Sequence, residues 1–331
     1  MFNGKSCAEC HAVPSVGGSE PNVGVARETR IGRQLPDGSF DPLDGVGPGS
    51  VNRGGGLLQQ RAINLPDCKK LAGEIVPQEA TFVSLRNTTG LFGAGLVEAI
   101  PEATIRANIS PSNPGKVNMV LDPDDNQMKV GRFGWKAQVA TLHQFAGDAY
   151  LNEMGITNPS FPKENLPQGQ PIPPGCDTVA DPEDMGDGVT AFENFMKLLA
   201  PLEPRRTATA REQQLFLTTG CASCHVPTMR TGSTSSVGAL NNQPVNLYSD
   251  LLLHDIGTND NIVQGLAQGK EFRTAPLWGL SRRDRFMHDG KSNKIEDAIL
   301  RHGGQAQTAR DNFVKLDKDA HDALLAFLGS L

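Results

Sequence analysis

The chain has 331 residues and is acidic, with a formal net charge of −6, and it contains 38% apolar but only 5% aromatic residues. The negative charge argues against nucleic acid as a partner, and no run of about 18 apolar residues is present that could span a membrane. Its 36 glycines and 23 prolines favour a mainly α protein, with short helices joined by long ordered loops, over a sheet protein. The length is sufficient for two domains of ordinary size.

Two C-x-x-C-H runs dominate the sequence. They consist of Cys7, Cys10 and His11 near the start and of Cys221, Cys224 and His225 in the last third. Each run supplies two thiols for thioether bonds to a haem and an imidazole for its iron. Half a zinc site is the alternative, but neither run has a second C-x-x-C or paired histidines nearby. We therefore predict two covalently bound haem c groups, with His11 and His225 as iron ligands.

The first run lies close to the start of the sequence. Met1 stands six residues before Cys7, which leaves no room for the helix that usually precedes such a site, so we expect a sequence truncated at its start and lacking its signal peptide. Covalent haem attachment takes place outside the bacterial cytoplasm, which predicts a periplasmic or other extracytoplasmic location. In that compartment Cys68 and Cys176 favour a disulfide over two unpaired buried thiols.

Residues 12–60 are dominated by Gly, Pro, Asn and Ser, and we expect them to form loop that wraps a haem edge. Five arginines in or beside this stretch are candidates to pair with haem propionates, with solvated surface arginine as the alternative for each. They are Arg27, Arg30, Arg33, Arg53 and Arg61. Farther on, Asp122, Asp124 and Asn126 match the start of a calcium loop, but the glycine and glutamate that such a loop needs later are missing.

Residues 131–155 carry the clearest helical pattern of the first half. His143 and Glu153 share the stripe of its apolar residues, whereas Asp148 lies elsewhere. Ten residues of helix span about 15 Å, so His143 and Glu153 cannot serve the same iron if the helix is unbroken. His143 is either a ligand of the first iron or a hydrogen-bonded core histidine. Glu153 is either an acid in the haem pocket or a surface glutamate near the helix end.

The best candidate linker is residues 201–207, where prolines and arginines interrupt the helical pattern. We predict an N-terminal cytochrome c-like domain with long insertions over residues 1–200. A C-terminal cytochrome c-like domain would follow over residues 201–331. Each domain would carry one haem.

Three further helices are predicted in the second half. Thr207 or Thr209 is expected to cap a helix that runs into Cys221, and Asp317 is expected to cap the C-terminal helix. These two helices should pack together over the second haem.

The third of these helices is shorter. It is predicted over residues 294–301, with Asn293 as N-cap and Glu296 completing a capping box. His302 ends its apolar stripe, where a neutral imidazole must find a partner. It is either an iron ligand or a satisfied core histidine.

The second half resembles the bacterial dihaem cytochrome c peroxidase and MauG superfamily, and more closely its dihaem oxidoreductase branch, often labelled thiol oxidoreductases. Residues 272–277, 286–290 and 295–299 are similar to the family blocks F-K-x-P-x-L, Y-F-H-D-G and L-E-E-A-V. The family's distal iron ligand lies fourteen residues after the histidine of the second block, which is His302 here. The resemblance therefore implies a bis-histidine haem between His225 and His302. It also implies that His254 and His288 pack near this haem without being ligands.

The resemblance extends over nearly the full length. In the first half it includes residues 133–135 and 153–155, which are similar to the family's F-W and E-M-G segments. It implies that Trp135 is the tryptophan between the two haems and that Glu153 is the distal acid beside the N-terminal haem. Lys136 replaces the aspartate that follows this tryptophan in the family.

The family also has an inter-domain calcium site, built from an asparagine and two backbone carbonyls. The corresponding positions in this sequence are Gly93, Arg283 and Arg285. Calcium is therefore a doubtful third cofactor beside the two haems.

The leading expectation for function is a peroxidase-like oxidoreductase. The N-terminal haem would meet hydrogen peroxide or another small oxidant, while the C-terminal haem would hold electrons exchanged with a small redox protein. Glu153 would move a proton between the peroxide oxygens, and Trp135 would pass the electron. One alternative is an oxidase or oxygenase of an organic substrate, as in rubber-cleaving dihaem relatives. The other is a non-catalytic electron-transfer cytochrome, which would use His143 to close the first iron.

Overall fold

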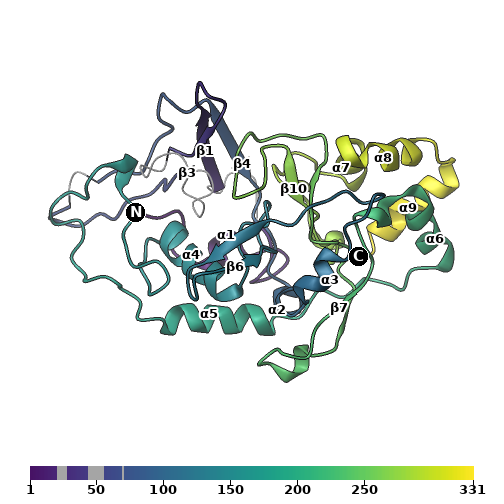
Figure 1. The fold of residues 1–331 in the computed structure, drawn as a ribbon, viewed down its shortest axis with the longest axis horizontal. Helices are drawn as coiled ribbons and strands as arrows, with labels where there is room; N and C mark the ends of the chain where they lie inside the picture. The colour runs from purple at the N-terminus through teal and green to yellow at the C-terminus, as the bar shows by residue number, and fades with distance from the viewer. Residues whose placement is uncertain (21–27, 44–55, 69–70) are drawn as a thin grey trace.

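Helices and loops make up most of the computed structural model, with short strands between them (Figure 1). The structure describes residues 1–20, 28–43, 56–68 and 71–331. The helices are α1 (Cys7–Cys10), α2 (Ala94–Glu98), α3 (Glu102–Arg106), α4 (Leu142–Met154), α5 (Asp187–Leu198), α6 (Ala210–Thr219), α7 (Ile295–Leu300), α8 (Gln307–Val314) and α9 (Lys318–Leu328). The predominance of helix and loop agrees with the predicted fold class.

Antiparallel pairs account for all the described strands. They are β1 (Glu28–Gln34), β2 (Phe40–Asp41), β3 (Gly56–Leu57), β4 (Phe82–Arg86), β5 (Met119–Asp122), β6 (Gln127–Val130), β7 (Met229–Arg230), β8 (Pro244–Val245), β9 (Leu253–Asp255) and β10 (Glu271–Arg273). In the first sheet, β1 pairs with β2, β3 and β4, while the other sheets are two-stranded.

The first sheet corrects the expectation that residues 12–60 are loop. β1 places Ile31 opposite Val83 of β4, and the Ile31 side chain is buried. The partner strand lies far along the chain, so the composition of residues 12–60 does not reveal the pairing. This strand matters for function because Glu28 and Arg30 lie on it.

The helix α4 begins and ends at residues with clear capping roles. The Thr141 side chain accepts a hydrogen bond from the Gln144 amide, and the helix ends at Gly155, which has a left-handed φ of 68°. α4 packs against α5 and α2, with Leu142 and Ala146 in the buried cluster between them. This packing fixes which face of α4 turns toward the first C-x-x-C-H run.

The helices α6 to α9 gather at the other end of the molecule's long axis (Figure 1). Thr209 and Glu212 form a capping box at the start of α6, and Asp317 caps α9, as predicted. α6 and α9 pack together through Phe216 and Phe327, whose ring centroids are 5.4 Å apart. The predicted packing of these two helices is therefore confirmed.

The short helix before His302 differs from its prediction by one residue. α7 has Lys294 as its N-cap, and no side chain caps it. The predicted cap at Asn293 is wrong because the extended backbone of Lys294 (φ −131°, ψ 150°) already separates that side chain from the first turn.

One hydrophobic cluster joins the two halves of the chain. It contains Val97 and Ile105 from the first half together with Leu247, Leu252 and Trp278 from the second. A buried ion pair of Arg86 with Asp260, at 2.8 Å, adds a second link. The division into domains at residue 200 stays a prediction.

Cys68 and Cys176 form a disulfide, so this predicted pairing is confirmed. It ties the segment after β3 to the long connection between α4 and α5. Among the described helices, none is long and apolar enough to cross a membrane.

Candidate functional site

The first C-x-x-C-H run lines a cavity of about 470 Å³ in the N-terminal half. Cys7, Cys10 and His11 all border it. The His11 Nδ1–H donates to the carbonyl of Gly18 at 3.0 Å. This bond fixes the tautomer and leaves Nε2 as the nitrogen with the lone pair that a metal ion needs. Burial lowers the pKa of His11, which keeps the imidazole in its neutral, ligating form.

The thiols of this run fit thioether bonds better than a zinc site. Burial raises the pKa of Cys7 and, together with the nearby Glu153 carboxylate, raises the pKa of Cys10 to about 11. Among the described residues, Cys7 and Cys10 belong to no cluster of three or more potential metal ligands, which a structural zinc site needs. Neither cysteine is in a disulfide, and both are available for covalent attachment.

Glu153, near the C-terminal end of α4, faces this cavity. Its carboxylate accepts a hydrogen bond from Asn3 Nδ2 at 3.0 Å. Burial and the negative charge of Glu28 raise the pKa of Glu153 to about 7. A carboxyl with such a pKa exchanges a proton readily near neutral pH. Of the two sequence alternatives, the structure favours the pocket acid.

Three more ionisable groups surround Glu153 in the cavity wall. Glu28 and Arg30 of β1 form an ion pair, and Asp148 of α4 lies close enough to feel the charge of Arg30. Burial raises the pKa of Asp148. The sequence analysis placed Asp148 outside the inward stripe of α4, which is wrong. The predicted inward stripe assumes that only one narrow face of α4 is buried, whereas the cavity is lined by a wider part of its circumference.

The arginines proposed for haem propionates take different positions. Arg30 lines the cavity, while Arg33 pairs with Asp41 at 2.9 Å and Arg61 pairs with Glu9 at 2.6 Å. Arg27 and Arg53 lie outside the described residues. Arg30 is therefore the candidate from this group that remains at the first site.

His143 does not face the first C-x-x-C-H run. Its Nδ1 lies 2.8 Å from a carboxylate oxygen of Glu193 on α5, and its Nε2 lies 4.0 Å from Asp124. It is not among the described residues that line the cavity. The prediction that the His143 imidazole faces inward is wrong because α5 packs on that side of α4 and supplies the acidic partner.

The second C-x-x-C-H run lines a cavity of about 190 Å³ in the C-terminal half. Cys221, Cys224, His225 and His302 border this cavity. His225 Nδ1–H donates to the Tyr248 carbonyl at 2.9 Å, and His302 Nδ1–H donates to the Ala298 carbonyl at 2.7 Å. Both rings thus keep Nε2 for a metal. The pKa of His225 is lowered to about 4, mainly by burial but also by the charge of His302, so the two rings are near each other.

The elements around this cavity explain how the two histidines meet. α6 ends at Gly220, whose φ of 98° is left-handed and lets the chain turn into Cys221. α7 ends just before His302, and Ile295 and Ile299 of its apolar side also line the cavity. Helix packing therefore brings together two histidines that are far apart in the sequence.

His254 and His288 also lie beside the second cavity. His254 Nε2 contacts Asp250 at 2.9 Å, and His288 stacks on Phe272 with ring centroids 3.9 Å apart. Cys224, Asp250 and His254 are close enough to suggest a metal cluster. Because Cys224 belongs to the C-x-x-C-H run, its sulfur is predicted to bind haem, and we assign no separate metal there.

Trp135 lines both cavities. Its Nε1–H donates to the Asn87 carbonyl at 2.7 Å, which fixes the indole. The indole also meets His288 edge to face, with ring centroids 6.3 Å apart. The predicted inter-site tryptophan thus lies between the two predicted haem sites.

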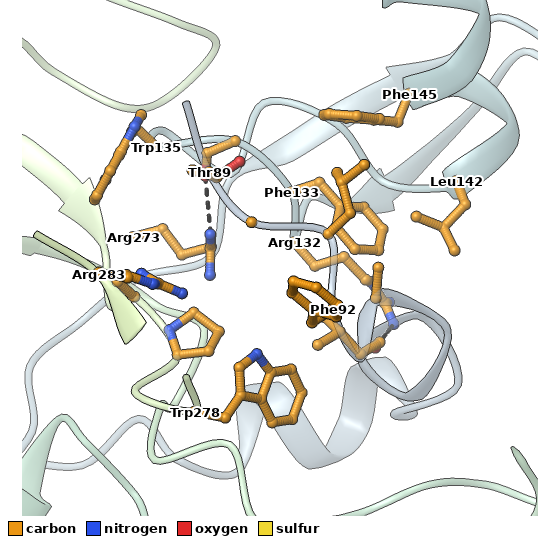
Figure 2. Close-up of a pocket in the computed structure, with 17 residues that line it drawn as sticks. Thr89, Phe92, Arg132, Phe133, Trp135, Leu142, Phe145, Arg273, Trp278 and Arg283 are labelled. Atoms are coloured by element: carbon orange, nitrogen blue, oxygen red, sulfur yellow. Dashed lines mark hydrogen bonds between the residues drawn. The ribbon is translucent and has the colours of Figure 1, made fainter. Parts of the chain in front are cut away.

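A small pocket beside Trp135 brings together arginines that the sequence does not predict to meet (Figure 2). Arg273 and Arg283 lie on one side of it, and Arg132 approaches from another part of its wall. Three arginines from separate segments carry no shared sequence signal, so only the fold reveals that they converge.

The two candidate calcium sites lack free oxygen ligands for a cation among the described side chains. Asp122 is paired with Lys129 at 2.7 Å, and the Asp124 carboxylate accepts a hydrogen bond from Ser160. At the second candidate, Gly93 stands where the family has its asparagine ligand, and it offers no side-chain oxygen. The described residues at both places therefore do not fit calcium.

Residues 70–331 match the family described as "Di-haem oxidoreductase, putative peroxidase". A search of curated protein sequences found no match.

Three solved structures are similar at low sequence identity. Hydrazine synthase of Kuenenia stuttgartiensis shares 18% identity over 75% of this chain and 73% of that chain, with a TM-score of 0.39. The diheme peroxidase BthA from Burkholderia thailandensis shares 17% identity over 62% of this chain and 66% of that chain, with a TM-score of 0.37. A MauG-like protein associated with microbial copper homeostasis shares 15% identity over 82% of this chain and 95% of that chain, with a TM-score of 0.37.

The family match covers most of the sequence and includes the second C-x-x-C-H run, Trp135 and Glu153. A di-haem family implies haem as the cofactor, and the histidines, thiols and cavities described above fit that group. The chain belongs to the di-haem oxidoreductase family, and it is an oxidoreductase.

Proposed function

We propose that the protein is a peroxidase-like enzyme that reduces hydrogen peroxide to water at the His11 site. It would carry two haem c groups, one attached to Cys7 and Cys10 and the other to Cys221 and Cys224. The observation that carries this proposal is a buried acid, Glu153, facing the His11 cavity with a pKa of about 7. Each domain of the predicted division would hold one haem.

The haem iron, when bound, would supply the redox chemistry that breaks the oxygen–oxygen bond. Hydrogen peroxide then needs two protons and two electrons to become two water molecules. The ionised carboxylate of Glu153 accepts a proton from one peroxide oxygen and returns it to the other, which becomes the leaving oxygen. Asn3 holds this carboxylate in place through its hydrogen bond.

The second cavity is suited to storing electrons. His225 and His302 would hold the haem iron together through Nε2, and an iron held by two histidines would not bind peroxide. In the first cavity, His11 is the only histidine among the described lining residues. That difference supports a reaction site at His11. Trp135 would conduct the electrons between the two sites because it lines both cavities.

A single substitution tests the role of Glu153. Glu153→Gln keeps the shape but removes the proton acceptor, so peroxide turnover should fall by about 10²–10⁴-fold while both haem spectra stay unchanged. Glu164→Gln is the matched control, because burial also raises the pKa of Glu164 to about 7 although Glu164 does not line the cavity. Unchanged turnover in Glu153→Gln would contradict the proposal.

A second candidate is oxidation of an apolar organic substrate at the same site. The observation that favours it is the apolar part of the His11 cavity wall, where Phe145, Phe192, Phe195 and Met196 lie. Oxygen uptake measured with a range of apolar compounds would support this candidate. If no compound caused oxygen uptake while the protein did turn over peroxide, this second candidate would be excluded and the peroxidase proposal would stand.

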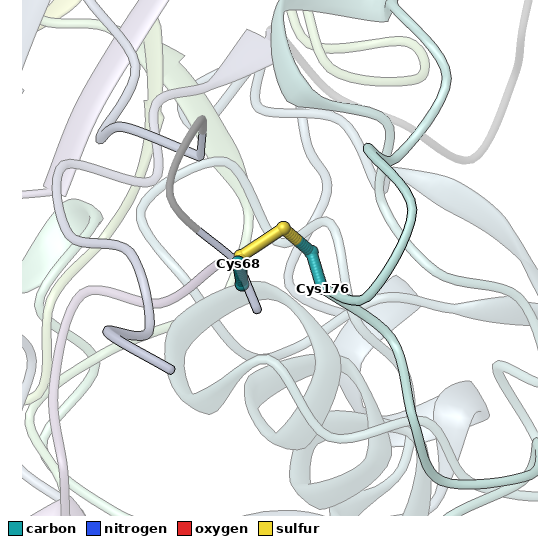
Figure 3. The surroundings of a disulfide bond; sticks show 2 residues. All are labelled: Cys68 and Cys176. Atoms are coloured by element: carbon teal, nitrogen blue, oxygen red, sulfur yellow. A yellow bond between two sulfur atoms is a disulfide. The ribbon is translucent and has the colours of Figure 1, made fainter. Parts of the chain in front are cut away.

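We also propose a periplasmic or other extracytoplasmic location, which the Cys68–Cys176 disulfide supports (Figure 3). Disulfides persist in oxidising compartments. A small redox protein from the same compartment would then supply the electrons. Calcium is not part of the proposal.

A further inference from the structure

The small pocket beside Trp135 is electrically unbalanced. Arg132, Arg273 and Arg283 line it, and no acidic side chain does so among the described residues. An unpaired guanidinium stays charged in a protein interior, because its pKa is too high for it to lose a proton. Burying such a charge without an anion is costly.

Two of these arginines already have acceptors. Arg132 donates to the backbone carbonyls of Val97, Glu98 and Ile100. Arg273 donates to the carbonyls of Gly134 and Thr274, at 2.9 and 3.2 Å. Carbonyl dipoles therefore hold both side chains, although no carboxylate neutralises them in this pocket.

Arg283 differs from the other two. No hydrogen bond or ion pair to its guanidinium occurs among the described residues, and burial lowers its pKa without any charged group acting in the opposite direction. Arg273 and Arg283 are also close enough that the charge of Arg283 helps to lower the pKa of Arg273 to about 10, after burial itself. Their guanidinium groups lie on the same side of the pocket (Figure 2).

The size of the pocket limits what can balance these charges. Its volume is about 50 Å³, several times the roughly 10–15 Å³ that a cavity needs to hold one water molecule. The pocket therefore has room for a carboxylate group. Phe92 and Trp278 form apolar parts of its wall.

We propose that this pocket is an anion site in which Arg283, assisted by Arg273, binds one carboxylate. Guanidinium forks bind carboxylates through two parallel hydrogen bonds, which would satisfy Arg283. The carboxylate has two sources. One is a haem propionate, because Arg273 and Arg283 also line the second cavity. The other is a free carboxylate from solution. The first source rests on the proposed haem at His225.

The experiment uses the intact, haem-loaded protein and measures the midpoint potential of each haem from pH 5 to 9. In the wild type a propionate paired with Arg283 stays ionised throughout, so it adds no pH dependence. In Arg283→Gln the pKa of that propionate should rise by about 1–3 units, which makes the midpoint of the His225 haem depend on pH. This readout requires no peroxide and remains valid if the protein is not a peroxidase.

Added formate distinguishes the free carboxylate. If the anion comes from solution, formate should shift the midpoint of the wild type until the site is saturated, and Arg283→Gln should abolish this response. Arg206→Gln is the control, because Arg206 is paired with Glu212 at 2.6 Å and is not among the described residues that line the second cavity. It should behave as the wild type does in both measurements.

The proposal fails if Arg283→Gln retains the pH dependence and the formate response of the wild type. Should Arg283→Gln not assemble with haem, Arg283→Lys decides the question. A lysine keeps the positive charge but cannot form the two parallel hydrogen bonds of a guanidinium. The pH dependence or formate response of the midpoint should therefore change in the same direction, but by less. No change in Arg283→Lys would then overturn the proposal.

Discussion

The two C-x-x-C-H sites have the same motif but different surroundings. The cavity at His11 is bordered by Glu28, Asp148 and Glu153 and by a single cation, Arg30, among the described residues. The cavity at His225 is bordered by a second metal-ready histidine and by several arginines. The difference teaches that the motif predicts only where a haem would attach. The residues that come from elsewhere in the fold decide whether the site suits proton transfer or electron storage.

The largest expected effect comes from removing the feature that most separates the two sites. His302→Ala should leave the second iron with His225 as its sole protein ligand and make it high-spin, as we expect for the first. Electron paramagnetic resonance of the oxidised protein would measure this change. His143→Ala is the control and should leave both signals unaltered, because His143 is paired with Glu193. A low-spin second haem in His302→Ala would show that another residue is the ligand.

The disulfide should matter more for the first site than for the second. Replacing Cys68 and Cys176 by serine should lower the free energy of unfolding by about 2–4 kcal/mol. The bond holds the segment after β3, and Gln59 of that segment donates to the carbonyls of Leu151 and Asn152 beside Glu153. Denaturant unfolding followed at each haem separately would measure the effect. An equal decrease in the free energy of unfolding at both haems would contradict the expectation that the disulfide matters more for the first site.

The smallest expected effect is a shift in pH dependence at the first site. Glu153 accepts a proton only when ionised, so turnover should rise as the pH passes its pKa of about 7. The positive charge of Arg30 lowers this pKa, and Arg30→Gln should therefore move the rise to higher pH, by about 1 unit. Arg33→Gln is the control, because Arg33 pairs with Asp41 away from the cavity. If the pH dependence of turnover in Arg30→Gln matched that of the wild type, the charge of Arg30 would have no influence on the pKa of Glu153.

Much of the C-terminal region could be predicted from local patterns. The caps at Thr209 and Asp317 and the position of His302 follow from short spacings, since helix capping and the end of an apolar stripe depend on neighbours in sequence. The N-terminal region was predicted less well. β1 depends on pairing with β4, and strand pairing between distant segments leaves little local signal.

The sequence by itself determined the two C-x-x-C-H runs that we predict to attach haem and the capped helices in the C-terminal region, because haem attachment and capping require fixed residues at fixed short spacings. Only the tertiary structure decided what surrounds those sites. It turned His143 toward Glu193, placed Asp148 in the first cavity and brought Arg283 into the pocket beside Trp135. The physical reason is that the direction of a helix face or a loop side chain depends on which distant element packs against it.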